Sequence, residues 1–319
     1  MNYFILAKIG NVNMKKTFQK TLIAAAAGVA LMSAVGTASA NSLLFPYFTT
    51  ATGAQSVLSL YTPVANATTG VHYVYNYGTA CTHFDAYGKL TANDILTHSI
   101  ASTTAGGFGK AVSGDTSTPV YFPLSGQTGF LVVTTRDTAS NTAATALQGA
   151  MAIVDPSSGL VVSYTGIDNA LDTTNVANEG NFAAITNTSF ALASLPTSLV
   201  TTSWYGVVVG DMSTAIGLGA NWAGVYTASS NGNVYNNDEV AYSGTKSKAI
   251  TCAGAITAAD LMTDAQIASV TATGSLIKVT GAGSATGTGA VMMKMQSVQA
   301  AVGAPFAGKQ FLHREIATN

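Results

Sequence analysis

The sequence predicts an all-β protein built as a β-sandwich, either immunoglobulin-like or jelly-roll-like. The first observation is a series of short runs rich in β-branched and aromatic residues, each bounded by turn residues. The second is that only 8% of the residues are charged while 48% are hydrophobic, so the chain can bury a core and is not a disordered segment. Many short strands with few helical patterns favour a sandwich.

The expected strands are, in chain order, 43–50, 56–61, 72–77, 128–135, 148–155, 160–165, 204–209, 276–280 and 290–298. Asp155-Pro156-Ser157-Ser158-Gly159 predicts a turn between two of them, since proline presets φ and glycine closes the turn. Asn231-Gly232 predicts a hairpin between 225–226 and 234–235.

The start of the chain has the three parts of a secretory signal peptide. Lysines at 15, 16 and 20 precede an apolar stretch at 21–35, and Ala38-Ser39-Ala40 is a small-residue cleavage site. We therefore assign residues 1–40 to the signal peptide, with Met14 as the true start, and residues 41–319 to a secreted β-sandwich domain.

The apolar part of this signal is shorter than the roughly 20 residues that a membrane-spanning helix needs. No later stretch of the sequence is longer, so we expect no transmembrane span.

After residue 40 the chain has nine basic and fourteen acidic residues, a net charge of −5. The bases are scattered and do not alternate with aromatics, which argues against nucleic acid as a partner.

The low charge has two interpretations. A surface of hydroxyls and amides is economical for an abundant exported protein. It also suits close lateral packing, because few lysines and glutamates would lose their hydration.

The only two cysteines, Cys81 and Cys252, predict one disulfide in an oxidising compartment. This bond would bring the first and last thirds of the mature chain together. It favours one large domain, or two lobes fused along an edge, over independent domains.

A ten-residue pattern, G-x-[LI]-T-A-x-D-[IL]-[LM]-T, occurs at 88–97 and again at 254–263. Its threonines, Thr91 and Thr257, suit helix N-caps. Asp94 and Asp260 follow three residues later, where a short acidic side chain can bond back to the cap residue and interact favourably with the helix dipole. We expect two short helical corners at sheet edges. The alternative is that the two aspartates form a site.

Two strands are candidates for binding. Tyr73, Tyr75 and Tyr77 share one face of their strand and could stack sugars, although such alternation is also typical of a half-buried strand. At the mature N-terminus, Leu43, Leu44, Phe45, Tyr47 and Phe48 form an apolar strand that could leave its own sheet and complete a neighbour's, as donor strands do. The plainer alternative is an ordinary first strand.

No catalytic or cofactor motif is present, so we expect a protein that is not an enzyme and has no cofactor. A nucleophile elbow, a complete dinucleotide fingerprint and a phosphate loop are missing from the sequence. Cys81, His83 and Asp85 lack the second ligand pair of a recognisable zinc site, so no metal is expected. An enzymatic alternative would use a dispersed site around His83, Asp85 and Asp94.

Several segments resemble those of a loose group of uncharacterised exported and cell-surface proteins of Gram-negative bacteria with an N-terminal LFPYFTT-type strand. These segments are NSLLFPYFTTATGAQSVLSLYTP, HYVYNYG, CTHFDAYGKLTANDIL, LQGAMAIVDPSSGLVVSY and GAVMMKMQ. The resemblance implies an all-β, surface-directed protein and transfers no functional residue.

We therefore expect a secreted, non-enzymatic surface protein that is structural and self-associating, as an extracellular layer or filament. The alternative is a secreted glycan- or ligand-binding module. The expected partners are further copies of the chain or cell-surface components, and the expected location is the cell surface or the extracellular space, with the periplasm as a further option.

Overall fold

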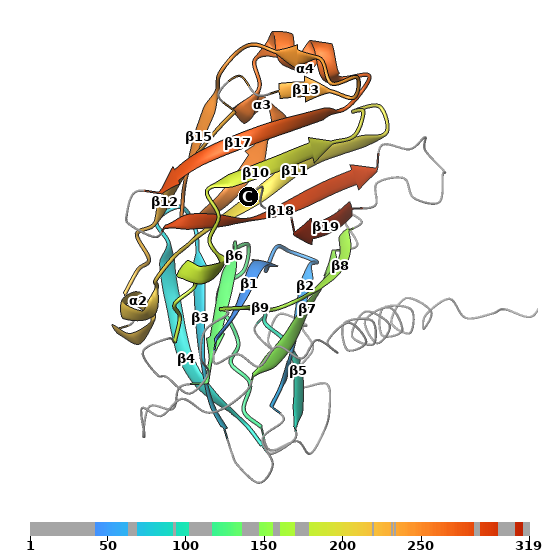
Figure 1. Ribbon diagram of the computed structural model, residues 1–319. Helices are drawn as coiled ribbons and strands as arrows, with labels where there is room; N and C mark the ends of the chain where they lie inside the picture. The colour runs from blue at the N-terminus through green and yellow to red at the C-terminus, as the bar shows by residue number, and fades with distance from the viewer. Residues whose placement is uncertain are drawn as a thin grey trace, which may run out of the picture.

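A computed structural model confirms the all-β, sandwich-like fold (Figure 1). It describes residues 42–62, 69–91, 94–101, 117–135, 147–155, 160–169, 179–218, 220–230, 232, 234–283, 288–298 and 310–314. The predicted signal peptide and the turn at 156–159 lie outside this range. The hairpin predicted at Asn231-Gly232 is wrong: residues 226–229 and 234–236 do not pair with each other, and both pair with the strand at 275–283.

Three sheets form the fold. The first has the order β4-β3-β6-β1-β9. Its strands are β1 (Ser42–Thr49), β3 (Thr69–Tyr77), β4 (Thr82–Leu90), β6 (Thr128–Thr134) and β9 (Ile167–Asp168).

The second sheet is the longest and has the order β16-β11-β18-β19-β8-β7-β2-β5. Its strands are β2 (Gln55–Tyr61), β5 (Ile95–Ser99), β7 (Gln148–Asp155), β8 (Leu160–Thr165), β11 (Val200–Val209), β16 (Ala253–Thr257), β18 (Gly289–Val298) and β19 (Gln310–Arg314).

The third sheet has the order β14-β13-β17-β12-β15, and β10 pairs with the remaining edge of β17. Its strands are β10 (Ser189–Ser194), β12 (Val225–Ser229), β13 (Val234–Asn236), β14 (Ala241–Tyr242), β15 (Ser247–Thr251) and β17 (Ser275–Gly283). The helical segments of the described chain are η3 (Ala183–Ile185), α2 (Ser213–Leu218), α3 (Ala258–Leu261) and α4 (Asp264–Val270).

The strand pairings occur twice along the chain. In the first unit, residues 42–169, β1 and β3 flank β6, β3 pairs with β4, and β2 pairs with both β5 and β7, which continues to β8. In the second unit, residues 179–314, β10, β12, β17 and β15 take the places of β1, β3, β6 and β4. Likewise β11, β16, β18 and β19 take the places of β2, β5, β7 and β8. The two units join where β19 lies parallel to β8 (Figure 1).

Strand β11 is buried on both faces. Trp204 and Val208 point into the core of the second unit, while Tyr205, Val207 and Val209 belong to the core that contains β1, β3 and β6. The ring of Tyr205 meets that of Tyr47 edge-on, with centroids 4.9 Å apart. One sheet layer therefore serves both units.

The predicted disulfide between Cys81 and Cys252 is confirmed, with the two Cα atoms 5.1 Å apart. Cys81 ends the turn between β3 and β4, and Cys252 lies where the chain passes from β15 to β16. Both cysteines have a positive φ, 52° for Cys81 and 66° for Cys252. Residues other than glycine rarely adopt this backbone conformation. The bond thus joins a sharp bend of the first unit to a sharp bend of the second.

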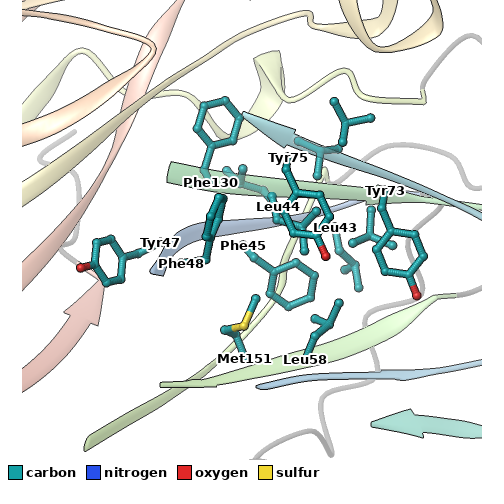
Figure 2. Close-up of a cluster of buried hydrophobic side chains, with 14 of the residues drawn as sticks. Leu43, Leu44, Phe45, Tyr47, Phe48, Leu58, Tyr73, Tyr75, Phe130 and Met151 are labelled. Atoms are coloured by element: carbon teal, nitrogen blue, oxygen red, sulfur yellow. The ribbon is translucent and has the colours of Figure 1, made fainter. Parts of the chain in front are cut away.

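The structure corrects the hypothesis of a free apolar strand at the mature N-terminus. Leu43, Leu44, Phe45, Tyr47 and Phe48 are all buried in the core of the first unit (Figure 2). Their strand, β1, lies between β6 and β9 inside its own sheet. Because all eight of its residues are buried, releasing it would open the core.

Hydroxyl groups cover the edge of β1 beyond the short strand β9. The Tyr164 hydroxyl of β8 accepts from the backbone N–H of Tyr47 and donates to its carbonyl oxygen. The Ser56 hydroxyl of β2 does the same for Thr49, at 3.1 and 2.8 Å. Side chains of the facing sheet therefore satisfy backbone groups that would otherwise expose a strand edge.

Phe45 requires two glycines opposite its ring. A Cβ atom added at Gly149 or at Gly166 would lie 2.9 Å from Cζ of Phe45, closer than real Cβ contacts allow. The absence of side chains at these positions lets the two sheets approach around the ring.

We predict that Gly149→Ala lowers the free energy of unfolding by about 1–3 kcal/mol, because the added methyl group overpacks the core against Phe45 and Leu60. Chemical denaturation of the purified variants measures this loss. Gly254→Ala is the matched control, since the nearest atom to its added Cβ lies at an ordinary 3.4 Å. Equal stability of the two variants would contradict the packing assigned to Phe45.

Candidate functional site

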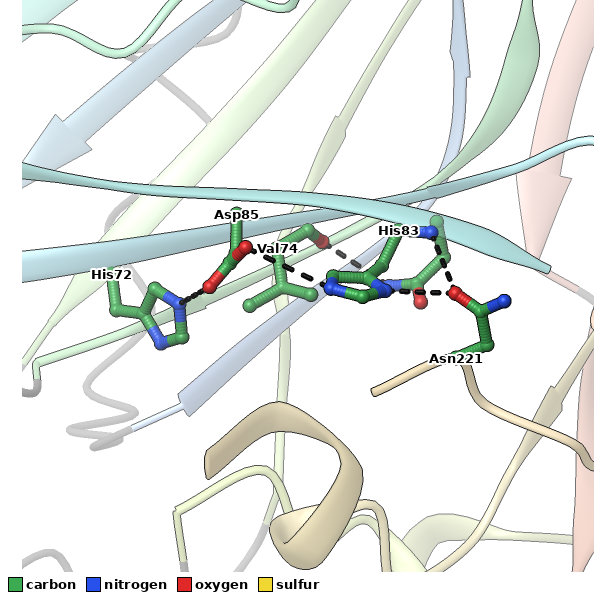
Figure 3. Close-up of polar contacts among 6 residues, drawn as sticks. His72, Val74, His83, Asp85 and Asn221 are labelled. Atoms are coloured by element: carbon green, nitrogen blue, oxygen red, sulfur yellow. Dashed lines mark hydrogen bonds and ion pairs between the residues drawn. The ribbon is translucent and has the colours of Figure 1, made fainter. Parts of the chain in front are cut away.

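The described residues contain one cluster of facing histidine and carboxylate side chains. Antiparallel pairing of β3 with β4 places His72, His83 and Asp85 on the face of the sheet opposite Tyr73. Asp85 lies between the two imidazoles (Figure 3): its Oδ2 is 3.5 Å from Nε2 of His72, and its Oδ1 is 3.8 Å from Nε2 of His83.

The cluster is closed on two sides. The Tyr87 ring stacks on His72 at 4.3 Å, and the His72 side chain is only 1% exposed. On the other side, Oδ1 of Asn221 lies 2.8 Å from Nδ1 of His83 and accepts from the His83 backbone N–H at 3.3 Å. The Nδ1–H of His83 therefore donates to Asn221, and Nε2 of the same ring faces Asp85.

These contacts attach the segment after α2 to the edge strand β4. Hydroxyl or thiol nucleophiles are not part of the cluster, and no group of three His, Cys, Asp or Glu side chains in the described part of the chain has metal-binding geometry. The sequence hypothesis of a dispersed site joined His83 and Asp85 to Asp94. The structure brings the first two together, whereas Asp94 follows the opposite end of β4.

The structure also corrects the tyrosine ladder. Tyr73, Tyr75 and Tyr77 share a face as predicted, but this face is the core: Tyr73 and Tyr75 are fully buried, and Tyr77 packs against the same cluster. Tyr75 lies between aromatic rings, 5.5 Å from Phe48 and 5.2 Å from Phe122. Burial raises the pKa of both buried tyrosines. They therefore offer no platform for stacking a sugar.

The repeated threonine–aspartate pattern forms the predicted local structure at its second copy. Thr257 caps α3, and its backbone N–H and its hydroxyl both donate to Oδ2 of Asp260 at 2.8 Å. Partial burial acts to raise the pKa of Asp260, but these bonds and the Lys248 ammonium, 3.3 Å away, hold it below its usual value.

At the first copy, Asp94 accepts hydrogen bonds from the hydroxyls of Thr91 and Ser117. Residues 92 and 93, where the first helical corner was expected, lie outside the described range. Figure 1 shows β4 in the first unit and α3 in the second, so each aspartate serves its own corner and the two do not form one site.

A second buried polar pair, His98 and Tyr73, was not predicted from the sequence. His98 of β5 is fully buried, and its Nδ1 donates to the Ser99 carbonyl at 2.9 Å. Its Nε2 and the Tyr73 hydroxyl have no hydrogen-bond partner among the described residues. The two rings are 6.1 Å apart. Burial lowers the pKa of His98 to about 4, so this histidine is neutral in the folded protein near neutral pH.

Comparison with protein families, with curated proteins and with solved structures finds no match for this chain. Within the described ranges, none of the helices has the length and apolar character that crossing a membrane requires. The disulfide is compatible with an exported protein.

We predict that acid destabilises the protein through His98. Above pH 6.5 the ring is neutral in both states; below it the unfolded chain gains a proton that the folded chain does not take up until about pH 4. The free energy of unfolding should therefore fall by up to about 3 kcal/mol over this window. Urea denaturation at a series of pH values measures the fall. In His98→Gln the contribution disappears, and an identical slope in the variant would contradict it.

Proposed function

We propose that this chain is an exported, non-enzymatic protein of the cell surface or extracellular space that acts structurally by associating with further copies of itself. One observation carries the proposal: residues 180–210 contain no Asp, Glu, Lys, Arg or His, and this stretch includes surface positions. A surface without charges can be brought against another without removing ions from water.

Two large apolar side chains of this stretch reach solvent. Leu195 is 49% exposed and Leu199 is 59% exposed, and both lie in the connection between β10 and β11. Exposed leucines next to an uncharged strand are typical of a surface that another protein covers.

The architecture suits a building block outside the cell. The disulfide and the shared strand β11 tie the two units together, so the molecule can transmit load between neighbours as one body. In this proposal the histidine–carboxylate cluster has a structural role, since Asn221 attaches its His83 to the segment after α2. The glycan-binding alternative has lost its proposed residues to the core.

We predict that residues 41–319, purified from the periplasm or culture medium, form assemblies whose size grows with protein concentration. Sedimentation velocity and negative-stain electron microscopy measure this. Because residues 180–210 carry no charge, association through them should respond little to sodium chloride and become stronger in sulfate. A monodisperse monomer at millimolar concentration would refute the proposed function.

A further inference from the structure

We infer that β10 is the strand by which two copies associate: its outer edge pairs antiparallel with β10 of a second copy, about a two-fold axis at Ala191. This inference rests on the proposed self-association and names the surface that performs it. It joins the third sheets of two molecules into one continuous sheet (Figure 1 shows β10 beside β17).

The outer edge of β10 is bare in the described structure. Gly281 donates from its backbone N–H to the Thr188 carbonyl at 2.6 Å, which fixes the alternation of the strand. Backbone groups of the even-numbered residues therefore face β17, and those of Ser189, Ala191 and Ala193 face outward. Among the described strands only β17 pairs with β10.

The equivalent edge in the first unit is covered. Strand β1 holds the place of β10 there, and β9, the Tyr164 hydroxyl and the Ser56 hydroxyl satisfy its outer backbone groups. In the described residues of the second unit, β18 bridges this edge only ahead of β10, at Asn187 and Ala290, and no strand or hydroxyl satisfies the outward backbone groups of Ser189, Ala191 and Ala193. The same strand position is thus closed in one unit and open in the other.

Two other edge strands, β4 and β15, carry protection against strand addition. On β4, Lys89 forms an isolated antiparallel β-bridge with Thr118, and the backbone N–H of His83 donates to the side chain of Asn221. On β15, Lys246 donates to the carbonyl of Ala259 in α3, and Lys248 pairs with Asp260. Lysines and covering loops are the usual means of blocking an edge. Strand β10 contains no charge and no proline.

A second copy fits this edge because an antiparallel pair of identical strands is self-complementary. With Ala191 opposite its own copy, Ser189 lies opposite Ala193, and each outward-facing residue exchanges a pair of hydrogen bonds with its partner. The side chains at these three positions are small and point away from the core residues Phe190 and Leu192, so they leave the approach unobstructed. The exposed leucines that follow β10 lie at the end of the new pair, where the second copy can cover them.

The test is Ala191→Lys, which puts two ammonium groups against each other at the axis, each also beside Lys278, the partner of Ala191 on β17. We expect the dissociation constant of the dimer, measured by sedimentation equilibrium, to rise at least about tenfold. Ala249→Lys is the matched control: Ala249 is an exposed alanine of β15 in the same sheet, so this variant should associate as the wild type does. Equal thermal unfolding midpoints of dilute variant and wild-type protein show that Ala191→Lys still folds.

Ala191→Cys tests the register directly. Paired residues in an antiparallel ladder have Cα atoms about 5.5 Å apart, within the range of about 4.4–6.8 Å that a disulfide spans. We expect a covalent dimer on a non-reducing gel, with the 191–191 link identified by mass spectrometry, and none from Ala249→Cys. If the wild type associates but Ala191→Lys has no effect and Ala191→Cys does not cross-link, the β10 interface is wrong and the proposed function stands. If the wild type does not associate at all, both fail.

Discussion

The double-sided burial of β11 and β18 is the constraint on which the rest of the structure depends. Trp204 and Met292 face one core, and Tyr205 and Met293 face the other, so residues 204–209 of β11 and 289–293 of β18 have no face for a charged side chain. This burial explains the absence of charge at 204–209, since a strand buried on both sides reads as a continuous apolar run. It does not explain the stretch around β10, where every second side chain points away from the core and Leu195 and Leu199 reach solvent. Around β10 the charge-free stretch therefore includes surface positions, and these are the positions that bear on the proposed function.

Local chemistry made several features predictable from the sequence. Alternating β-branched and aromatic residues between turns identified nine of the nineteen described strands and the sandwich class, but not β10. An even cysteine count behind a predicted export signal identified the Cys81–Cys252 bond. The second threonine–aspartate repeat formed its cap because Thr257 and Asp260 need only each other. Each of these follows from residues near in sequence, or from a pairing with only one solution.

Features that depend on distant contacts were not predictable. Alternation shows that Tyr73 and Tyr75 share a face, but it does not show which face meets the other sheet, and that face proved to be the core. The same limit applies to β1: its outer edge is closed by Tyr164, 117 residues further along the chain, and nothing near β1 announces that hydroxyl. The contact of Asp85 with His72 needs the register of β3 against β4, and that of His83 with Asn221 needs a loop 138 residues away.

Because the strand pairing occurs twice, the wrong prediction that β1 is a free associating strand can be compared with its counterpart in the second unit. The apolar strand expected to associate was β1, and the strand whose edge is open is β10, its counterpart in the second unit. Strand addition at β10 also has a geometric consequence, because a two-fold pair closes on itself and cannot propagate. A layer or filament would then have the dimer as its repeating unit and would need a second, different surface to extend. That surface cannot be the edge of β1, which is already satisfied within its own chain by β9, Tyr164 and Ser56.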